Sequence, residues 1–157
     1  MKAPAEILMI EDSATDTELT QRAFTRASIA HPLTVMTTGE AASDYLLGSG
    51  KWAKRGAARP PQLILLDLQL PKMSGIDFLR QIKRDPRTWD IPVISLSFTT
   101  SAPAIVTCYR LGVADHMIKP VDVKKLVRIM KKLKLPLTIL QPEVGSSGAA
   151  PPGDRRT

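Results

Sequence analysis

The chain has 157 residues, of which 43% are hydrophobic and 24% charged, and 22 lysines and arginines against 15 aspartates and glutamates give it a net charge of +7. This length predicts one domain with room for a tail, and the composition excludes a disordered or collagen-like chain. No apolar run approaches the roughly 18–20 residues of a membrane span, the N-terminus lacks the pattern of a signal peptide, and the lone Cys108 favours a reducing, cytoplasmic setting.

Short β-rich runs alternate with helical patterns along the chain. Strands are predicted at residues 6–10, 33–36, 63–66, 91–96 and 113–118, and helices at residues 14–28, 39–47, 74–84, 102–111 and 122–133. The third strand is a continuous apolar run, which is typical of a strand covered on both faces. In the first helix, the spacing of Leu19, Ala23 and Ala27 predicts the buried face.

Five β–α repeats predict an α/β domain over residues 1–140, with a doubly wound parallel sheet and helices on both faces. Residues 50–61 are rich in Gly, Lys, Arg and Pro and are expected to form a long loop. Residues 141–157 are rich in Pro, Gly and Ser and are expected to form a disordered tail.

The positive charge is unevenly distributed. Residues 119–134 hold seven lysines and arginines against one aspartate, and residues 51–59 hold four against none, so the remainder of the chain is net negative. A basic helix and a basic loop on an acidic body favour an acidic protein partner over nucleic acid.

Polar residues follow four of the five predicted strands. Glu11 and Asp12 follow the first strand, Asp67 the third, Ser97 the fourth and Lys119 the fifth. Because sites in doubly wound sheets form at the carboxyl ends of the strands, these side chains are expected to converge. Taken singly, each has a plainer interpretation as a helix start, a strand end or a turn, so the prediction rests on their occurring together.

The expected cluster indicates metal-assisted phosphoryl chemistry. Three neighbouring carboxylates repel one another unless a cation neutralises them, and an oxygen-rich site of this kind suits Mg²⁺. A carboxylate is also a known nucleophile toward phosphorus, and a lysine offsets the charge of the phosphoryl group.

Three motifs identify a family at this point. The acidic pair ends the run at residues 7–12 (ILMIED), Asp67 lies in residues 65–75 (LLDLQLPKMSG), and Lys119 precedes Pro120. The chain thereby resembles the receiver domains of response regulators, the CheY-like family, over about residues 5–135. That resemblance implies a flavodoxin-like sheet of strand order 2-1-3-4-5, as well as a signalling protein and not a conventional enzyme.

The resemblance also implies a role for each site residue. Asp67 would accept a phosphoryl group from a histidine kinase in a two-component phosphorelay, and Lys119 would contact that group. Mg²⁺ would be held by Asp12, Asp67 and the main-chain carbonyl of Gln69, with Glu11 acting through water. The Lys119–Pro120 peptide bond would be cis.

Two positions depart from the family pattern. The hydroxyl expected after the fourth strand is supplied by Ser97, but the small residue expected next is replaced by Phe98. Phe98 either gates access to the site or turns away to pack against the loop. The Tyr or Phe of the family's switch position is replaced by His116, which either acts as the switch or is a satisfied histidine on the surface side of the fifth strand.

Loops and helices suggest the partners. The loop before the third strand and the runs at residues 83–86 and 91–93 are similar to single-domain regulators partnered with bacterial phytochromes. The fourth helix has few charges, which predicts an interface. A homodimer is expected through the fourth helix, fifth strand and fifth helix, or through the apolar segment 135–140.

Two rival functions compete with the phosphoaccepting receiver. An aspartate-nucleophile phosphatase would need a second acid two residues after Asp67, where Gln69 stands. A degenerate receiver would bind protein or nucleic acid without phosphorylation. Labelling of the wild type and of Asp67→Asn with a phosphodonor discriminates the three.

Overall fold

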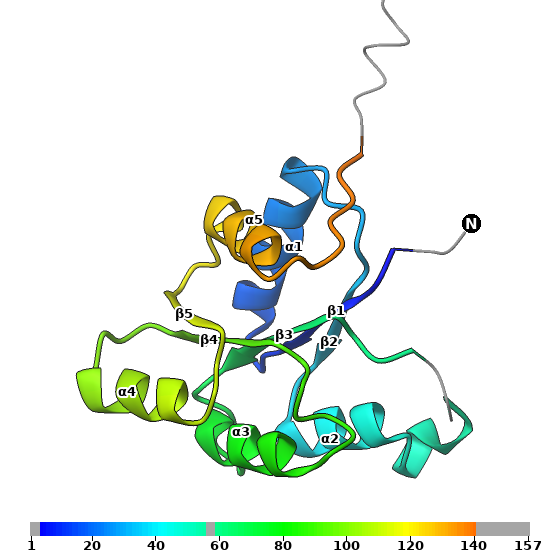
Figure 1. Ribbon diagram of the computed structural model, residues 1–157, viewed down its shortest axis with the longest axis vertical. Coiled ribbons are helices and arrows are strands. Elements are labelled where there is room, and N and C mark those ends of the chain that lie inside the picture. Colours follow the sequence, from blue (N-terminus) through cyan, green and yellow to red (C-terminus); the bar gives the residue numbers. More distant parts are fainter. Residues whose placement is uncertain (1–3, 56–58, 141–157) are drawn as a thin grey trace, which may run out of the picture.

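Strands and helices alternate along the chain in the computed structural model, which describes residues 4–55 and 59–140 (Figure 1). The strands are β1 (Ile7–Ile10), β2 (Leu33–Met36), β3 (Leu63–Asp67), β4 (Val93–Ser97) and β5 (Asp115–Ile118). The helices are α1 (Ala14–Arg26), α2 (Gly39–Leu47), α3 (Gly75–Arg84), α4 (Ala102–Arg110) and α5 (Val123–Lys132). The predicted element ends therefore lie within two residues of the observed ones. The predicted tail at 141–157 lies outside the described residues.

The region expected to be a plain loop begins with regular structure. Residues 50–55 form a short 3-10 helix, η1 (Gly50–Arg55), directly after α2. The Trp52 ring packs edge-on against Tyr45 of α2, with the ring centroids 4.8 Å apart. This aromatic contact holds η1 against the domain, and the sequence prediction missed it because single-turn helices have weak periodicity.

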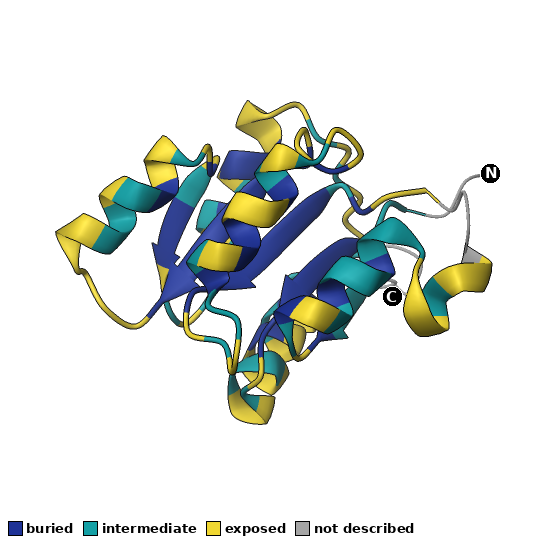
Figure 2. Ribbon diagram, turned by 90° about the horizontal axis from the view of Figure 1, so that it is seen from below, coloured by how far each residue is buried: buried dark blue, intermediate teal, exposed yellow. Residues whose placement is uncertain are grey.

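The five strands form one parallel sheet in the order β2-β1-β3-β4-β5, which confirms the predicted topology. Strands β1 and β3 are fully buried, as expected for apolar runs covered on both sides. Figure 2 shows the buried strands between helices whose outer faces are exposed. Among the described helices, none is long and apolar enough to cross a membrane.

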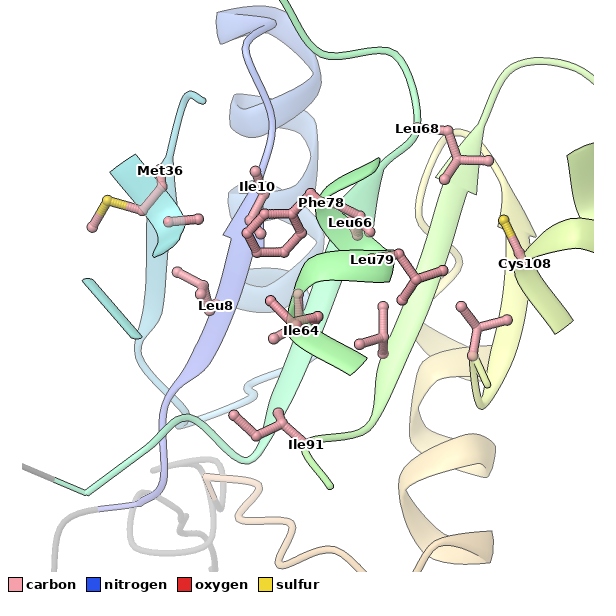
Figure 3. Close-up of a cluster of buried hydrophobic side chains, with 14 of the residues drawn as sticks. Leu8, Ile10, Met36, Ile64, Leu66, Leu68, Phe78, Leu79, Ile91 and Cys108 are labelled. Carbon is pink, nitrogen blue, oxygen red and sulfur yellow. The ribbon is translucent and has the colours of Figure 1, made fainter. Parts of the chain in front are cut away.

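Alternate strand residues point to two separate cores. On one face, Leu8, Ile10, Ile64 and Leu66 pack with Phe78 and other side chains of α2, α3 and α4 (Figure 3). On the opposite face, Ile7, Met9, Leu63 and Leu65 pack with side chains of α1 and α5, including Phe24, Leu126 and Met130. The two-residue period of the strands thus separates the helices into two layers.

The predicted buried face of α1 is wrong by one position. Leu19 is 47% exposed, whereas Thr20 and Phe24 are buried. Thr20 is tolerated inside because its hydroxyl donates to the main-chain oxygen of Asp16 at 3.0 Å. The larger Phe24 then fills the space against the sheet.

The apolar segment 135–140 lies against its own chain. The main chain pairs across residues 28–30, with Ala30 N donating to Thr138 O and Leu140 N donating to Ser28 O. The buried His31 accepts the Thr138 N–H through Nε2 at 2.8 Å, so its Nδ1 carries the proton and donates to Ala5 O at 2.7 Å. These contacts occupy the main-chain edge of the segment, whereas the side chains of Ile139 and Leu140 stay exposed, so dimerisation through it remains a prediction.

Candidate functional site

The residues predicted to converge lie together at the carboxyl edge of the sheet. Ile10 pairs with Leu66 in the parallel register, which places the following residues, Glu11 and Asp67, side by side. Ser97 is the last residue of β4 and pairs with Ile118, the residue before Lys119. The register of β1, β3, β4 and β5 therefore brings the predicted site residues to one place.

The ammonium of Lys119 is at the centre of the acidic residues. Its Nζ lies 2.6 Å from Glu11 Oε1, 3.0 Å from Asp16 Oδ2 and 3.2 Å from Asp67 Oδ2. The Lys119 side chain is only 5% exposed, so these ion pairs are shielded from water and strengthened. The Lys119–Pro120 peptide bond is cis, as expected.

Burial and charge alter the proton affinities of this cluster. Burial raises the pKa of Glu11 to about 7; Lys119 opposes that rise and the neighbouring Asp67 adds to it. Burial acts to lower the pKa of Lys119, but the carboxylates of Glu11 and Asp16 outweigh it, so that pKa is raised and the ammonium stays charged. The site therefore holds a fixed cation beside a carboxyl group that titrates near neutral pH.

The acidic residues can supply ligands for a metal ion. Ligand oxygens of Glu11, Asp12 and Asp67 all lie within 4.8 Å of one another. Glu11 and Asp67 are buried, whereas Asp12 is exposed and opens the cluster to solvent. Hard oxygen ligands with an open side fit Mg²⁺, which keeps several of its waters.

The loop after β3 fixes the carboxylate of Asp67. The Gln69 N–H donates to Asp67 Oδ1 at 3.0 Å, and the opposite oxygen faces Lys119. Gly75, the first residue of α3, packs directly on this loop, and its N–H donates to Leu68 O. A Cβ at Gly75 would lie 2.4 Å from Asp67 O and 2.6 Å from Leu68 Cα, so only glycine fits there.

His116 is buried between two serines of β4, which corrects the expectation of a surface-side histidine. Its Nδ1 lies 2.7 Å from Ser95 Oγ, and its Nε2 lies 3.1 Å from Ser97 Oγ. Ser97 donates its hydroxyl hydrogen to Thr99 O at 2.9 Å, so it accepts from His116 Nε2–H. Burial, together with the charge of Lys125, lowers the pKa of His116 and keeps the ring neutral at neutral pH.

Comparison with known proteins agrees with this geometry. A family model described as the response regulator receiver domain matches residues 7–131. This chain belongs to the response regulator receiver family. It is a signalling domain by family, and its acidic cluster and lysine lie where the sheet topology of a receiver places them.

Two relatives, one of them also matched as a solved structure, are similar to this chain. The probable methanogenesis regulatory protein FilR2 of Methanothrix harundinacea is 35% identical over 131 residues, covering 83% of this chain and 82% of that protein. Response regulator Rcp1 of Synechocystis is 32% identical over 131 residues, covering 83% of this chain and 87% of its own. The Mn²⁺-bound structure of Rcp1 matches with a TM-score of 0.70 at 32% identity over 88% of this chain and 99% of that one.

A phytochrome-linked regulator is also similar in structure. The bacteriophytochrome response regulator AtBRR matches with a TM-score of 0.79 at 30% identity, covering 90% of this chain and all of that chain. The resemblance to regulators of this group, inferred above from loops, is therefore shown at the level of fold and sequence.

Phe98 lies on the solvent side of the receiver's lysine. The ring is 63% exposed, and its centroid is 4.9 Å from Lys119 Nζ. It is therefore not buried, and its ring faces the lysine instead of turning away to pack against the loop, while its role as a gate stays a prediction. The aromatic face contacts the ammonium in a cation–π interaction.

Asp16 is the site residue that sequence reasoning missed. From the sequence alone, an acid at this position is accounted for by the first turn of α1, where the helix dipole favours acids. In the receiver its carboxylate contacts Lys119, which is 103 residues further along the chain.

The close approach of α3 to the loop after β3 predicts a loss of stability in Gly75→Ala. The added methyl meets main-chain atoms that cannot rotate away, so we expect a loss of about 1–3 kcal/mol in the free energy of unfolding. Urea unfolding measures it. Gly39→Ala is the control, because its methyl meets the flexible end of Met73 at 3.0 Å. Equal stability of the two variants would contradict this account.

Proposed function

We propose that the protein accepts a phosphoryl group on Asp67 from a histidine kinase, binds Mg²⁺ in doing so, and signals through contact with other proteins. The observation that supports this most directly is the contact of 3.2 Å between Asp67 Oδ2 and the buried ammonium of Lys119 beside two further carboxylates. A buried cation facing the end of a carboxylate is suited to a group that arrives with negative charge.

The proposed reaction moves one phosphoryl group between two side chains. A carboxylate oxygen of Asp67 forms a bond to phosphorus while the P–N bond of the kinase phosphohistidine breaks, and the electron pair of that bond stays on the imidazole nitrogen. The carboxylate is oriented by the Gln69 N–H at Oδ1. Lys119 gives charge stabilisation to the phosphoryl oxygens as they arrive.

Magnesium would be held by Asp12, Asp67 and the main-chain carbonyl of Gln69, with Glu11 acting through water. The donor set fits a hard divalent cation, because ligand oxygens of three carboxylates gather within 4.8 Å. When bound, the ion supplies positive charge that neutralises the carboxylates and the phosphoryl oxygens. Glu11 also contacts Lys119 directly, so it links the metal side of the site to the lysine side.

Ser97 and His116 form the proposed switch. The Ser97 hydroxyl donates to Thr99 O, and it must turn away from that oxygen to donate to a phosphoryl group. That turn removes or redirects the acceptor of His116 Nε2–H, a buried donor that would then need a new partner. The main-chain oxygen of His116 accepts from Lys125 of α5 at 3.0 Å, so movement of the histidine reaches the α5 surface.

The output surface is proposed to be α4, β5 and α5, where a second copy of the chain docks. Val106 and Tyr109 of α4 are 45% and 49% exposed, and Ile118 of β5 is also exposed. Tyr109 donates to Asp115 Oδ1 at 2.8 Å, one residue before His116. This apolar surface is therefore joined to the proposed switch.

The proposed kinase is a bacterial phytochrome, because the chain matches AtBRR along nearly its whole length. FilR2 is also similar, and its name refers to methanogenesis, so the identity of the kinase is proposed separately from the phosphorylation of Asp67. Illumination tests the identity of the kinase, because phosphoryl transfer from a phytochrome kinase changes between red and far-red light.

If Asp67 accepts the phosphoryl group, the wild type should be labelled by a phosphodonor and Asp67→Asn should not. The protein is incubated with Mg²⁺ and either radiolabelled acetyl phosphate or an autophosphorylated bacterial phytochrome kinase, and protein-bound label is measured. The amide cannot form the acyl phosphate, so the variant should stay unlabelled. Label that persists in the variant would place the acceptor elsewhere, and no label in either protein would favour the phosphorylation-independent alternative.

Magnesium affinity is expected to rise with pH around neutrality. Below its pKa of about 7, Glu11 is protonated, and the proton must leave before the carboxylate favours a cation. The dissociation constant for Mg²⁺, measured by calorimetry between pH 6 and 8, should fall by up to about tenfold per pH unit below that pKa. Glu11→Gln removes the titrating group and should flatten the profile. An unchanged slope in the variant would contradict the assignment.

The raised pKa of Glu11 also determines the direction in which the stability of the metal-free protein changes with pH. Because the pKa of Glu11 is raised on folding, the native state binds more protons than the unfolded state between about pH 4.5 and 7. The contribution of Glu11 to the free energy of unfolding of the metal-free protein is therefore largest at the low end of this window and decreases as the pH rises through it, which urea unfolding of the wild type and Glu11→Gln across this range measures.

The switch predicts a change of association on phosphorylation. Beryllofluoride with Mg²⁺ should shift the sedimentation coefficient of the wild type toward the dimer at tens of micromolar protein, by a population change of about tenfold, which corresponds to about 1.4 kcal/mol. His116→Ala should remain labelled at Asp67 but lose the shift, whereas His116→Tyr should retain it. A monomer under all conditions would contradict the dimer.

A further inference from the structure

The Asp16 carboxylate has no assigned role although it touches the central cation of the site. Asp16 Oδ2 lies 3.0 Å from Lys119 Nζ, and the Asp16 side chain is 17% exposed. The contact joins the first turn of α1 to the residue after β5. Its position between two separate elements suggests a function in holding them, or in holding the lysine.

Three acidic neighbours surround the ammonium of Lys119, and one of them, Asp16, accepts a hydrogen bond from it. A lysine ammonium donates three hydrogen bonds and accepts none, and Glu11, Asp16 and Asp67 surround it at 2.6, 3.0 and 3.2 Å. Two contacts, to Glu11 and Asp16, are the shorter ones. Of the three, only the contact to Asp16 Oδ2 has hydrogen-bond geometry, so Asp16 fixes one N–H direction of the ammonium, whereas Glu11 and Asp67 act on it as ion-pair partners.

Packing alone does not fix this direction. Lysine is a point charge on a flexible four-carbon stem. A water-sized cavity of about 10 Å³ borders the side chain, and its wall includes Asp16, Thr20, Lys119 and Pro120. The stem therefore has space to move, and the electrostatic contacts must set where the ammonium points.

The main-chain N–H and C=O of Asp16 are both hydrogen-bonded. The Asp16 N–H donates to Ser13 Oγ at 3.1 Å, and Asp16 O accepts from the buried Thr20 hydroxyl. Unlike Glu11, Asp12 and Asp67, it is not part of the cluster that could hold a metal ion among the described residues. Its carboxylate thus stays with Lys119 when the other acids engage a cation.

We propose that Asp16 is a positioning residue that directs the Lys119 ammonium toward Asp67 and the phosphoryl group it accepts, an inference that rests on the proposed phosphorylation of Asp67. Asp16 touches neither the phosphoryl group nor the metal and acts only through Lys119. Its oxygen position matters more than its charge, because Glu11 and Asp67 already neutralise the lysine.

Position and charge are separated by two variants. Asp16→Asn keeps an acceptor oxygen at the same place and removes the charge, whereas Asp16→Glu keeps the charge and displaces it by one methylene. With acetyl phosphate and Mg²⁺, we expect labelling of Asp67 to slow about tenfold in Asp16→Glu and Asp16→Ala, and to stay within about threefold of the wild type in Asp16→Asn. Glu18→Gln, an exposed charge change on the same helix, is the matched control.

A spectroscopic readout tests the lysine directly. The ¹⁵N-labelled ammonium of a buried, ion-paired lysine exchanges its hydrogens slowly and gives its own NMR signal. We expect that signal in the wild type, Asp16→Asn and Glu18→Gln, and its loss by fast exchange in Asp16→Ala.

Failure of this inference is distinct from failure of the proposed function. If the wild type is labelled and both Asp16→Ala and Asp16→Glu are labelled at its rate, Asp16 does not position Lys119, and the proposed function stands. If Asp16→Asn slows as much as Asp16→Ala, charge and not position is what matters, and the inference is wrong. If the wild type itself is not labelled, the proposed function fails first. Thermal unfolding establishes that each variant is folded.

Discussion

The buried ion cluster around Lys119 is the interaction on which the rest of the site depends. Three carboxylates at 2.6–3.2 Å from one ammonium leave the cluster short of positive charge, and like charges at this distance repel. Burial raises the pKa of Glu11, and the neighbouring Asp67 adds to that rise although Lys119 opposes it. The sheet holds these carboxylates together against their mutual repulsion, which a bound cation would relieve.

The fold and the principal site residues could be predicted from the sequence for a single reason. In a parallel sheet the carboxyl ends of all strands reach the same edge, so residues directly after strand-like runs must meet. Glu11 and Asp67 are neighbours because Ile10 pairs with Leu66, a register that follows from aligning two apolar runs. The buried face of α1 was missed because a threonine took an interior position that side-chain polarity argues against, and its hydroxyl is satisfied by the helix itself.

Contacts between helix starts and loops could not be predicted in this way. Asp16 meets Lys119 only because of how the first turn of α1 approaches the residue after β5, which no local pattern records. The burial of His116 had a clearer signal. Ser95 and Ser97 alternate with Leu96 in a fully buried strand, so two hydroxyls on one face of the sheet needed partners, and β5 pairs His116 with Ser95.

Lys119 is the one residue of the basic segment 119–134 that lies inside the acidic site, and the exposed lysines at the end of α5 lie away from it. A helix that follows a parallel strand runs back along the sheet, so α5 begins near the site and ends away from it. Its ten residues span about 15 Å, which exceeds the screening length of about 8 Å in physiological salt. The exposed basic end of the helix, at residues 131–134, is thus largely screened from Glu11 and Asp67. The local carboxylates determine what binds at the edge of the sheet, whereas the lysines of residues 131–134 influence which partners approach α5.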